Sequence, residues 1–322
     1  MVYRLYARFK SEKFFSQKLL IQNTLWWIEY AGIDGIREDT YPYNDQKYLA
    51  EWANAILNEY PDFNIVGEIW QGIPSVVSGY QSKSPVRKID FDSNLPSVTD
   101  FALSDAIRDY LRGAKSIYKI YETIVQDIVY SDPDNLLVFF DNHDVDRAML
   151  VADGNVDKFK IALNLVLFTR GIPKIFYGTE IGIKGGTKHG ELRKPFSGGF
   201  VGDDRNTFTK VGRTQYEIDI YDYLQKLLKL RNAYPSLSKG KLRHIYPFDD
   251  IYTLVKNYED ETTMVVINSR EGEFSIESSQ IKNFLPEANG LVNLKTNEEI
   301  NLNSIDNFLI NKMTAEIFLI RK

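Results

Sequence analysis

Short apolar segments that end in charged or polar residues recur along the first 180 residues, and this pattern restricts the fold more than any other feature. Residues 31–39 and 63–68 each end in an acid, and residues 136–140 run directly into D-N-H-D at 141–144. Segments with the apolar spacing of helices lie between them. Strands that alternate with helices in this way are typical of a parallel α/β fold.

The alternation continues to about residue 238. The spacing predicts helices over residues 12–30, 45–59, 100–112, 157–169 and 216–233, and further strands over residues 88–91 and 172–177. In a (β/α)8 barrel and in a doubly wound sheet alike, functional side chains follow the carboxyl ends of the strands. No G-x-G-x-x-G follows an early strand, which disfavours a dinucleotide-binding sheet.

After residue 238 the pattern changes to short alternating runs separated by turn residues. The alternation predicts strands over residues 252–258, 263–268, 274–277, 291–294 and 316–320. We therefore predict two domains, an α/β domain over residues 1–238 and an antiparallel β-sandwich over residues 239–322.

The composition argues against several classes of protein. The chain has no cysteine, which excludes disulfides and thiolate chemistry, and only three histidines, too few for a histidine-rich metal site. A net charge of −5 without a dense basic run argues against a nucleic-acid partner. No stretch approaches the ~18 apolar residues of a membrane span, and no signal-peptide run is present. We expect a soluble protein, cytoplasmic or, if a longer precursor is exported, periplasmic.

Three carboxylates stand at the ends of separate predicted strands. Each has an ordinary explanation when taken alone, since Asp39 could cap a helix, Glu68 could lie on the surface and Asp144 could lie in a turn. Together they would meet in one pocket of a barrel, where their mutual repulsion costs free energy unless they serve a function. Arg37, two residues before Asp39, could neutralise part of this charge.

Paired carboxylates suit the hydrolysis of glycosidic bonds. In a retaining enzyme one carboxylate attacks the anomeric carbon, and a second carboxyl group about 5–5.5 Å away protonates the leaving oxygen. The apolar sequence around Glu68 suits the proton donor, and the nearby Arg37 suits an ionised Asp39. Binding of Mg²⁺ or Ca²⁺ is the weaker alternative, because no phosphate-binding motif accompanies these acids.

At these residues the sequence resembles the α-amylase family of glycoside hydrolases. The similar segments are G-I-R-E-D at 35–39, V-G-E-I-W at 66–70, F-D-N-H-D at 140–144 and G-I-P-K-I-F-Y-G-T-E at 171–180. They follow the order of the family's motifs on barrel strands four, five, seven and eight. A further segment, residues 193–204, resembles the glycine-rich D-F-P-G-G-x-x-G-D loop of neopullulanases and cyclomaltodextrinases.

The resemblance implies a role for each motif residue. Asp39 would be the nucleophile, Glu68 the general acid and base, and Asp144 the carboxylate that stabilises the transition state. The residues expected to bind substrate are Arg37, Asn142, His143, Tyr43 and Trp70. No cofactor is implied to be required. Calcium occurs in many relatives, but this sequence identifies no ligands for it.

The reaction implied by the resemblance is retaining hydrolysis of α-1,4-glucosidic bonds in maltodextrins, cyclodextrins or pullulan, through a covalent glycosyl-enzyme intermediate. A glucan transglycosylase would use the same acids, so it stays an alternative. A catalytically silent glucan-binding or interaction protein on the same fold is the alternative from another class, although such a protein usually lacks one or more of the acids that this chain retains.

Two departures from the family pattern bear on these expectations. Pro42-Tyr43 stands where the family's fourth-strand motif usually has Lys-His. In addition, the nucleophile strand is the first clear strand, so residues 1–238 hold a partial barrel of about strands four to eight, whereas a complete one takes about 250 residues. We expect a segment upstream, or a second copy of the chain, to supply the rest, and we expect the chain alone to be a poor catalyst.

Overall fold

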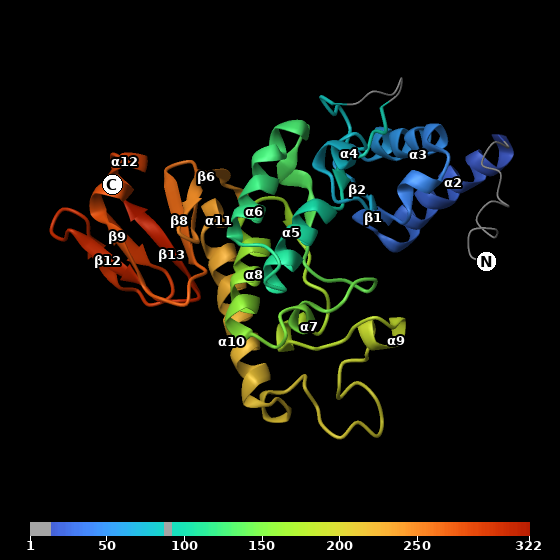
Figure 1. Ribbon diagram of the computed structural model, residues 1–322. Coiled ribbons are helices and arrows are strands. Elements are labelled where there is room, and N and C mark those ends of the chain that lie inside the picture. Colours follow the sequence, from blue (N-terminus) through green and yellow to red (C-terminus); the bar gives the residue numbers. More distant parts are fainter. Residues whose placement is uncertain (1–13, 87–91) are drawn as a thin grey trace. The chain divides into compact units, whose positions relative to one another are not determined.

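A computed structural model describes residues 14–86 and 92–322 and is drawn in Figure 1. The described residues form two compact units. The first holds the chain up to Ala102 together with Val125–Val138, and the second holds Leu103–Ile124 and Phe139–Lys322. The strand predicted over residues 88–91 lies outside the described residues. The predicted domain boundary after residue 238 stays a prediction.

The first unit is a small parallel α/β layer. Its helices are α2 (Phe14–Ala31), α3 (Gln46–Glu59) and α4 (Pro74–Ser78), with 3-10 turns η1 (Tyr41–Tyr43), η2 (Val125–Val129) and η3 (Pro133–Asn135). Its strands are β1 (Gly35–Glu38), β2 (Asn64–Gly67), β3 (Ser97–Val98) and β4 (Leu137–Val138). The first three pair in parallel in the order β1-β2-β3, and Thr99 forms a parallel bridge to Leu137. The carboxyl ends of these strands therefore share one edge.

Helix α3 covers the parallel layer through an amphipathic face. Asp45 caps it by accepting a hydrogen bond of 3.0 Å from the Tyr48 main-chain N–H. The buried face of α3 joins a core with strand residues such as Ile65. The Trp52 indole donates to the Thr24 hydroxyl at 3.0 Å, which ties α3 to α2. Apolar burial and this bond together hold the helices against β1 and β2.

The end of β2 has no room for a side chain at Gly67. A β-carbon there would lie 2.6 Å from Leu95 Cδ1 and 3.4 Å from the Tyr41 ring, and both neighbours are fully buried. Gly67 pairs with Glu38 in the register of the two strands. The glycine therefore lets the core close directly beneath the two acids that follow β1 and β2.

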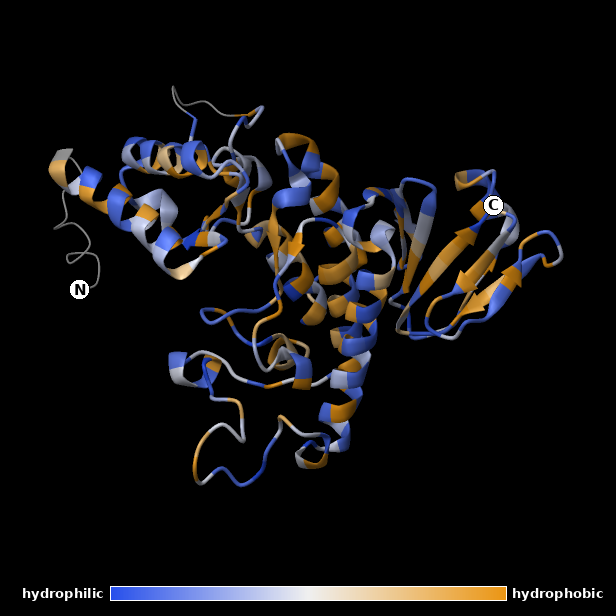
Figure 2. Cartoon of the chain, turned by 180° about the vertical axis from the view of Figure 1, so that it is seen from behind, coloured by the Kyte–Doolittle hydropathy of each residue, from blue (hydrophilic) through white to orange (hydrophobic). Residues whose placement is uncertain are grey.

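The second unit begins with mostly helical segments. Its helices are α5 (Phe101–Leu111, whose first two residues belong to the first unit), α6 (Ile117–Ile124), α7 (Ala148–Val151), α8 (Val156–Phe168), α9 (His189–Leu192), α10 (Gln215–Ala233), α11 (Pro235–Lys239) and α12 (Ser278–Phe284). Its 3-10 turns are η4 (Thr179–Ile181) and η5 (Lys210–Gly212). Helix α8 is buried on nearly every side, and it is rich in apolar residues, which are orange in Figure 2.

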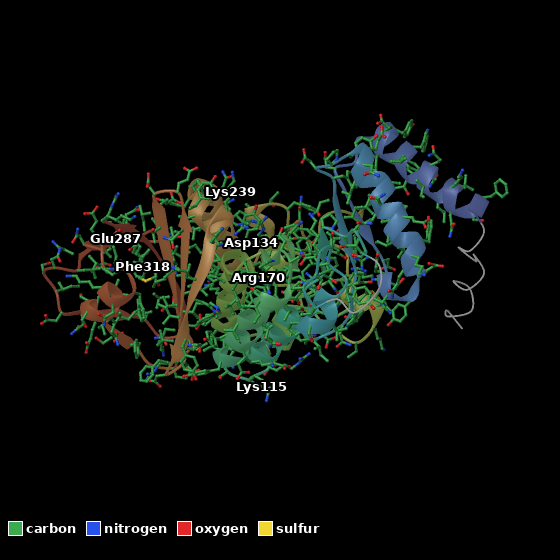
Figure 3. The ribbon with its side chains drawn as sticks, turned by 90° about the horizontal axis from the view of Figure 1, so that it is seen from above. Lys115, Asp134, Arg170, Lys239, Glu287 and Phe318 are labelled. Atoms are coloured by element: carbon green, nitrogen blue, oxygen red, sulfur yellow. The ribbon has the colours of Figure 1, made fainter. Side chains whose placement is uncertain are left out.

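The strands of the second unit are β5 (Ile172–Pro173), β6 (Lys241–Phe248), β7 (Ile251–Tyr258), β8 (Glu261–Asn268), β9 (Phe274–Glu277), β10 (Gly290–Asn293), β11 (Glu299–Asn301), β12 (Asn307–Ile310) and β13 (Thr314–Arg321). Six of them form one antiparallel sheet in the order β11-β10-β13-β8-β7-β6, and β9 pairs with β12. In Figure 3 Phe318 lies within this β region and Glu287 lies at its margin. The predicted antiparallel C-terminal domain is confirmed.

Two predicted strands are shorter in the structure, and that prediction was wrong in extent. The run over residues 136–140 forms a strand only at Leu137–Val138, and the run over residues 172–177 only at Ile172–Pro173. Phe139 and Phe140 are buried, but the Phe140 carbonyl accepts from the Arg108 guanidinium at 3.3 Å instead of continuing a ladder. Pro173 has no main-chain N–H and therefore cannot donate a hydrogen bond to a neighbouring strand.

We predict that Gly67→Ala destabilises the first unit by about 1–3 kcal/mol, because the added methyl group collides with Leu95. All four tryptophans lie in the first unit, so urea unfolding followed by tryptophan fluorescence reports on that unit. The matched control is the same substitution in a Leu95→Ala background, where the collision is relieved and the loss should shrink. An equal loss in both backgrounds would contradict this account of Gly67.

Candidate functional site

The carboxyl ends of β1 and β2 bring Arg37, Asp39 and Glu68 together. The strands pair in parallel with Arg37 opposite Val66 and Glu38 opposite Gly67, and the Glu68 N–H continues the ladder to the Glu38 carbonyl at 2.9 Å. Asp39 and Glu68 therefore follow directly at the same edge of the layer. Asp39 and Glu68 are far apart in the chain, but the parallel pairing of β1 and β2 brings them to the same edge.

One guanidinium binds both acids. Arg37 Nη1 lies 2.9 Å from Asp39 Oδ1, and Arg37 Nη2 forms an ion pair with Glu68 Oε1. The planar fork of an arginine can face two carboxylates at once, which a lysine cannot do with the same geometry. The repulsion between the two acids is offset by this shared cation.

The two carboxylates differ in their exposure to water. Only 6% of the Glu68 side chain is exposed, whereas 58% of the Asp39 side chain is. Glu68 Oε2 accepts a further hydrogen bond of 3.1 Å from the Thr40 main-chain N–H. A buried carboxyl group needs such partners, because each unsatisfied oxygen costs free energy.

Thr40 reaches Glu68 through a strained backbone. Its φ of 49° and ψ of 37° are left-handed, a conformation that branched side chains rarely adopt. The strain costs on the order of 1–2 kcal/mol. It turns the chain after Asp39 so that the Thr40 N–H points to Glu68. The sequence motif gave no sign of this contact, because any residue has an N–H.

Glu38 lies between Arg37 and Asp39 in the sequence and was not singled out by the motif. Burial, helped by the charge of Asp39 and opposed by Arg37, raises the pKa of Glu38 to about 7. Burial together with Glu38 also raises the pKa of Tyr48, on helix α3, to about 12. Glu38 is thus a half-buried acid beneath the site.

Tyr43 and Trp70, the two aromatic residues expected to bind substrate, both keep large exposed areas. Tyr43 ends the η1 turn and is 75% exposed. Trp70 stacks on Phe101, with ring centroids 5.0 Å apart, and is 52% exposed. Flat exposed rings of this kind can pack against the apolar faces of sugar rings.

In the second unit Asn142, His143 and Asp144 form a separate group. Asn142 Oδ1 accepts from the main-chain N–H groups of Asp144 at 2.7 Å and Val145 at 3.0 Å, which fixes the turn. His143 Nε2 lies 3.0 Å from Asp144 Oδ2. The other oxygen of Asp144 binds Arg193 Nη2 at 2.8 Å. Arg193 begins the glycine-rich segment, but its sequence motif did not mark it as a site residue.

The turn is anchored from below by Asp141. Its carboxylate is buried, accepts from the Ala148 N–H and the Thr179 hydroxyl at 3.0 Å each, and faces Arg147. Burial raises the pKa of Asp141, and Arg147 opposes that shift. These contacts join residues 141–148 to the η4 turn, so the buried Asp141 carboxylate serves to hold the turn in place.

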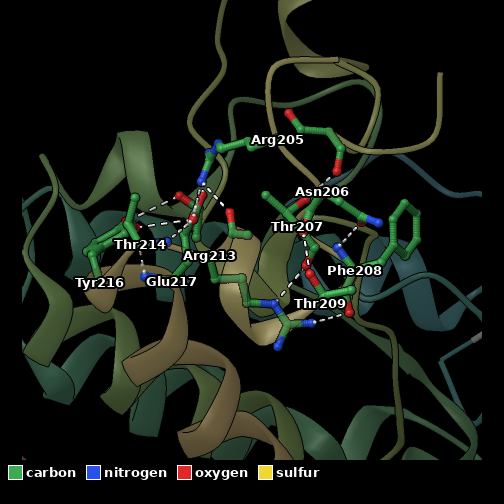
Figure 4. A network of polar contacts seen from close by, with 12 residues as sticks. Arg205, Asn206, Thr207, Phe208, Thr209, Arg213, Thr214, Tyr216 and Glu217 are labelled. Carbon is green, nitrogen blue, oxygen red and sulfur yellow. Dashed lines mark hydrogen bonds and ion pairs between the residues drawn. The ribbon is translucent and has the colours of Figure 1, made fainter. Parts of the chain in front are cut away.

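The glycine-rich segment that follows Arg193 is held by a polar network, shown in Figure 4. Arg205 Nη2 binds Glu217 at 2.7 Å, and Glu217 also accepts from the Thr214 N–H at 2.8 Å at the start of α10. Arg213 Nε donates to the Thr207 carbonyl at 2.8 Å. The N–H groups of Gly198 and Phe200 bind Asp203 and hold the pKa of its carboxyl below the usual range. The segment is therefore ordered by its own side chains.

Neither a cluster of acidic or histidine metal ligands nor a membrane-spanning helix is found among the described residues. No group of three or more His, Asp or Glu side chains among them is arranged to hold a metal ion. We therefore assign no calcium ligands. No helix in the described part of the chain has the length and apolarity needed to cross a membrane.

We predict that the stability of the first unit falls as the pH rises from about 4.5 to about 7, because Glu38 has a higher pKa in the folded state than its usual value of 4.5. Below this window both states are protonated, and above it the folded state must hold a half-buried charge. Glu38→Gln should remove roughly 1–2 kcal/mol of this dependence. Urea unfolding by tryptophan fluorescence at pH 5 and 8 measures it.

The control for that measurement is Glu51→Gln, which removes an exposed glutamate of helix α3. It should leave the difference between pH 5 and pH 8 as in the wild type. If Glu38→Gln also leaves the difference unchanged, the half-buried carboxyl does not govern the pH dependence.

The chain matches two known domain families. Residues 17–240 match the alpha amylase catalytic domain, and residues 242–318 match the cyclo-malto-dextrinase C-terminal domain. Among solved structures, the α-amylase from Geobacillus thermoleovorans, complexed with acarbose, has a TM-score of 0.79 at 24% identity and shares the fold. The match covers 97% of this chain and 65% of that chain. An Anoxybacillus α-amylase has a TM-score of 0.78 at 25% identity, over 96% of this chain and 64% of that one.

Curated relatives are similar over most of this chain but are themselves longer. A β/α-amylase of Paenibacillus polymyxa is 29% identical over 87% of this chain and 21% of its own length. A cyclomaltodextrinase of Thermoanaerobacter pseudethanolicus is 24% identical over 79% of this chain and 40% of its own length. The chain thus spans well under two thirds of these relatives. Since the catalytic-domain match covers residues 17–240, the chain belongs to the α-amylase family of glycoside hydrolases.

Proposed function

We propose that the chain provides the nucleophile and the acid/base of a retaining hydrolase that cleaves α-1,4-glucosidic bonds. The observation that carries the proposal is the pair of acids, Asp39 and Glu68, which share the Arg37 guanidinium at the ends of neighbouring parallel strands. Two carboxyl groups side by side in different surroundings are what double displacement at an anomeric carbon requires.

The difference in exposure between the two acids supports a different role for each. Asp39, exposed and paired with Arg37 at 2.9 Å, is the nucleophile, and its oxygen forms the bond to the anomeric carbon as the glycosidic bond breaks. Glu68, almost fully buried, gives its proton to the departing oxygen. In the second step Glu68 takes a proton from water, whose oxygen attacks the same carbon and releases Asp39. The anomeric configuration is therefore retained.

Asp144 is the proposed third carboxylate, and it stabilises the positive charge of the oxocarbenium-like transition state. Its partner His143 donates to sugar hydroxyls, and Asn142 fixes the turn that carries both. Tyr43 and Trp70 supply the exposed aromatic faces on which sugar rings pack. No step requires a metal ion.

Maltodextrins, cyclodextrins and pullulan are the proposed substrates. The match of residues 242–318 to the cyclo-malto-dextrinase C-terminal domain supports this choice. Relatives named cyclomaltodextrinase and neopullulanase 2, the latter from Thermoactinomyces vulgaris, support it too. The resemblance of residues 193–204 to the loop of those enzymes points the same way.

We predict that the purified chain releases glucose and maltose from maltotriose or γ-cyclodextrin slowly, with a turnover number below the usual 1–10³ s⁻¹, because the exposed Asp39 is poorly shielded from water. Asp39→Asn and Glu68→Gln should each lower the rate by about 10³-fold or more. Chromatography of the sugars measures the rate, and proton NMR of the first product should show the α-anomer.

The matched control is Asp34→Asn, which removes an exposed acid just before β1. It should keep the wild-type rate. Product formed equally by the wild type and by Asp39→Asn, or no product from any of these proteins, would overturn the proposal. A β-anomer as the first product would overturn the retaining mechanism alone.

A further inference from the structure

Arg193 contacts both the side chain and the backbone of the His143–Asp144 pair. Its Nη2 binds Asp144 Oδ1 at 2.8 Å, and its Nε donates to the His143 carbonyl at 3.1 Å. Since His143 Nε2 lies 3.0 Å from Asp144 Oδ2, both carboxylate oxygens have a partner. Asp144 is thus held between a guanidinium and an imidazole.

The segment that carries Arg193 is fixed to the segment that carries Asp144. The Arg147 N–H donates to the Gly185 carbonyl at 2.9 Å, and the Thr187 N–H donates to Asp146 Oδ1 at 2.8 Å. A β-carbon at Gly186 would collide with the Leu150 side chain. Glycine at 186 therefore lets the two segments approach closely, which sets the position of helix α9 and of Arg193 at its end.

A purely structural ion pair would not need this arrangement. Arg193 is 48% exposed, and an ion pair of such exposure contributes about 0–1 kcal/mol to folding. The two-point contact instead restricts how the Asp144 carboxylate can rotate. A lysine in its place could pair with the carboxylate. It lacks the planar guanidinium, so it could not bind the His143 carbonyl at the same time in the same geometry.

We propose that Arg193 is a positioning residue, which holds the Asp144 carboxylate and the His143 imidazole in the orientation used to bind the sugar at the reacting carbon. This inference rests on the proposed function, since it gives Asp144 its role at the transition state. It links the glycine-rich segment, which begins at Arg193, to the stabilisation of the transition state by Asp144. Displacement of the carboxylate by about 1 Å can cost about 10²-fold in rate.

The kinetic test compares Arg193→Gln, Arg193→Lys and Lys194→Gln on maltotriose. Arg193→Gln should lower kcat by about 10–100-fold with a smaller change in KM, and Arg193→Lys should restore part of the loss. Lys194→Gln is the matched control, because Lys194 is the next residue, equally exposed at 48%, and pairs with Glu191 instead. It should keep the wild-type kcat.

A second measurement needs no substrate. Arg193 Nη2 and His143 Nε2 bind opposite oxygens of Asp144, so replacing the Arg193 cation by a neutral glutamine should raise the NMR titration midpoint of the His143 imidazole, because a nearby positive charge is removed. The His143 signal is assigned by its absence in His143→Gln. His244, which is hydrogen-bonded to Tyr252 at 2.9 Å, serves as the reference that should not move. Lys194→Gln should leave both midpoints in place.

The outcomes separate this inference from the proposed function. If the wild type hydrolyses maltotriose, Asp39→Asn does not, and Arg193→Gln matches the wild type in kcat and in the His143 midpoint, the inference is overturned while the function stands. If no protein hydrolyses a glucan, the proposed function fails, and the role given to Asp144 fails with it. In that case, a His143 midpoint that is the same in Arg193→Gln as in the wild type would also contradict the contact between Arg193 and the His143–Asp144 pair.

Discussion

The candidate site depends on one guanidinium that faces two carboxylates. At about 4 Å two like charges repel by about 1 kcal/mol in water and by about 4 kcal/mol near a protein surface. Arg37 lies on β1, two residues before Asp39, and meets Glu68 because β1 and β2 pair in parallel and end together. The parallel register therefore places the shared cation between the two acids. Gly67 lets the core pack tightly beneath the two acids. The left-handed turn at Thr40 directs its N–H to Glu68.

The sequence was sufficient for those parts of the site that stand at the end of an apolar run. Asp39 and Glu68 could be found because each strand stops at a charge, and parallel strands end at a common edge. The same holds for α10, whose apolar spacing and following Pro235 mark its extent. These features are local, since a few neighbouring residues decide them, and the resemblance of four motifs then supplied the family.

The rest depends on contacts between distant residues. Arg193 lies 49 residues from Asp144, and the Thr40 N–H that binds Glu68 carries no side-chain signal. The half-burial of Glu38 follows from the packing of the first unit, not from its neighbours in the chain. Strand β6 was not predicted, because Lys241, Arg243 and other polar residues make up an edge strand that is largely exposed.

The order of strands in the six-stranded sheet has a consequence for synthesis on the ribosome. Strand β13 is the last of the six along the chain, yet it lies between β8 and β10 in the middle of the sheet. Until it emerges, the β6-β7-β8 hairpins and the β10-β11 pair remain two separate pieces with open edges. The nascent chain must therefore carry unpaired strand edges until the final strand inserts, a period in which a chaperone would protect it.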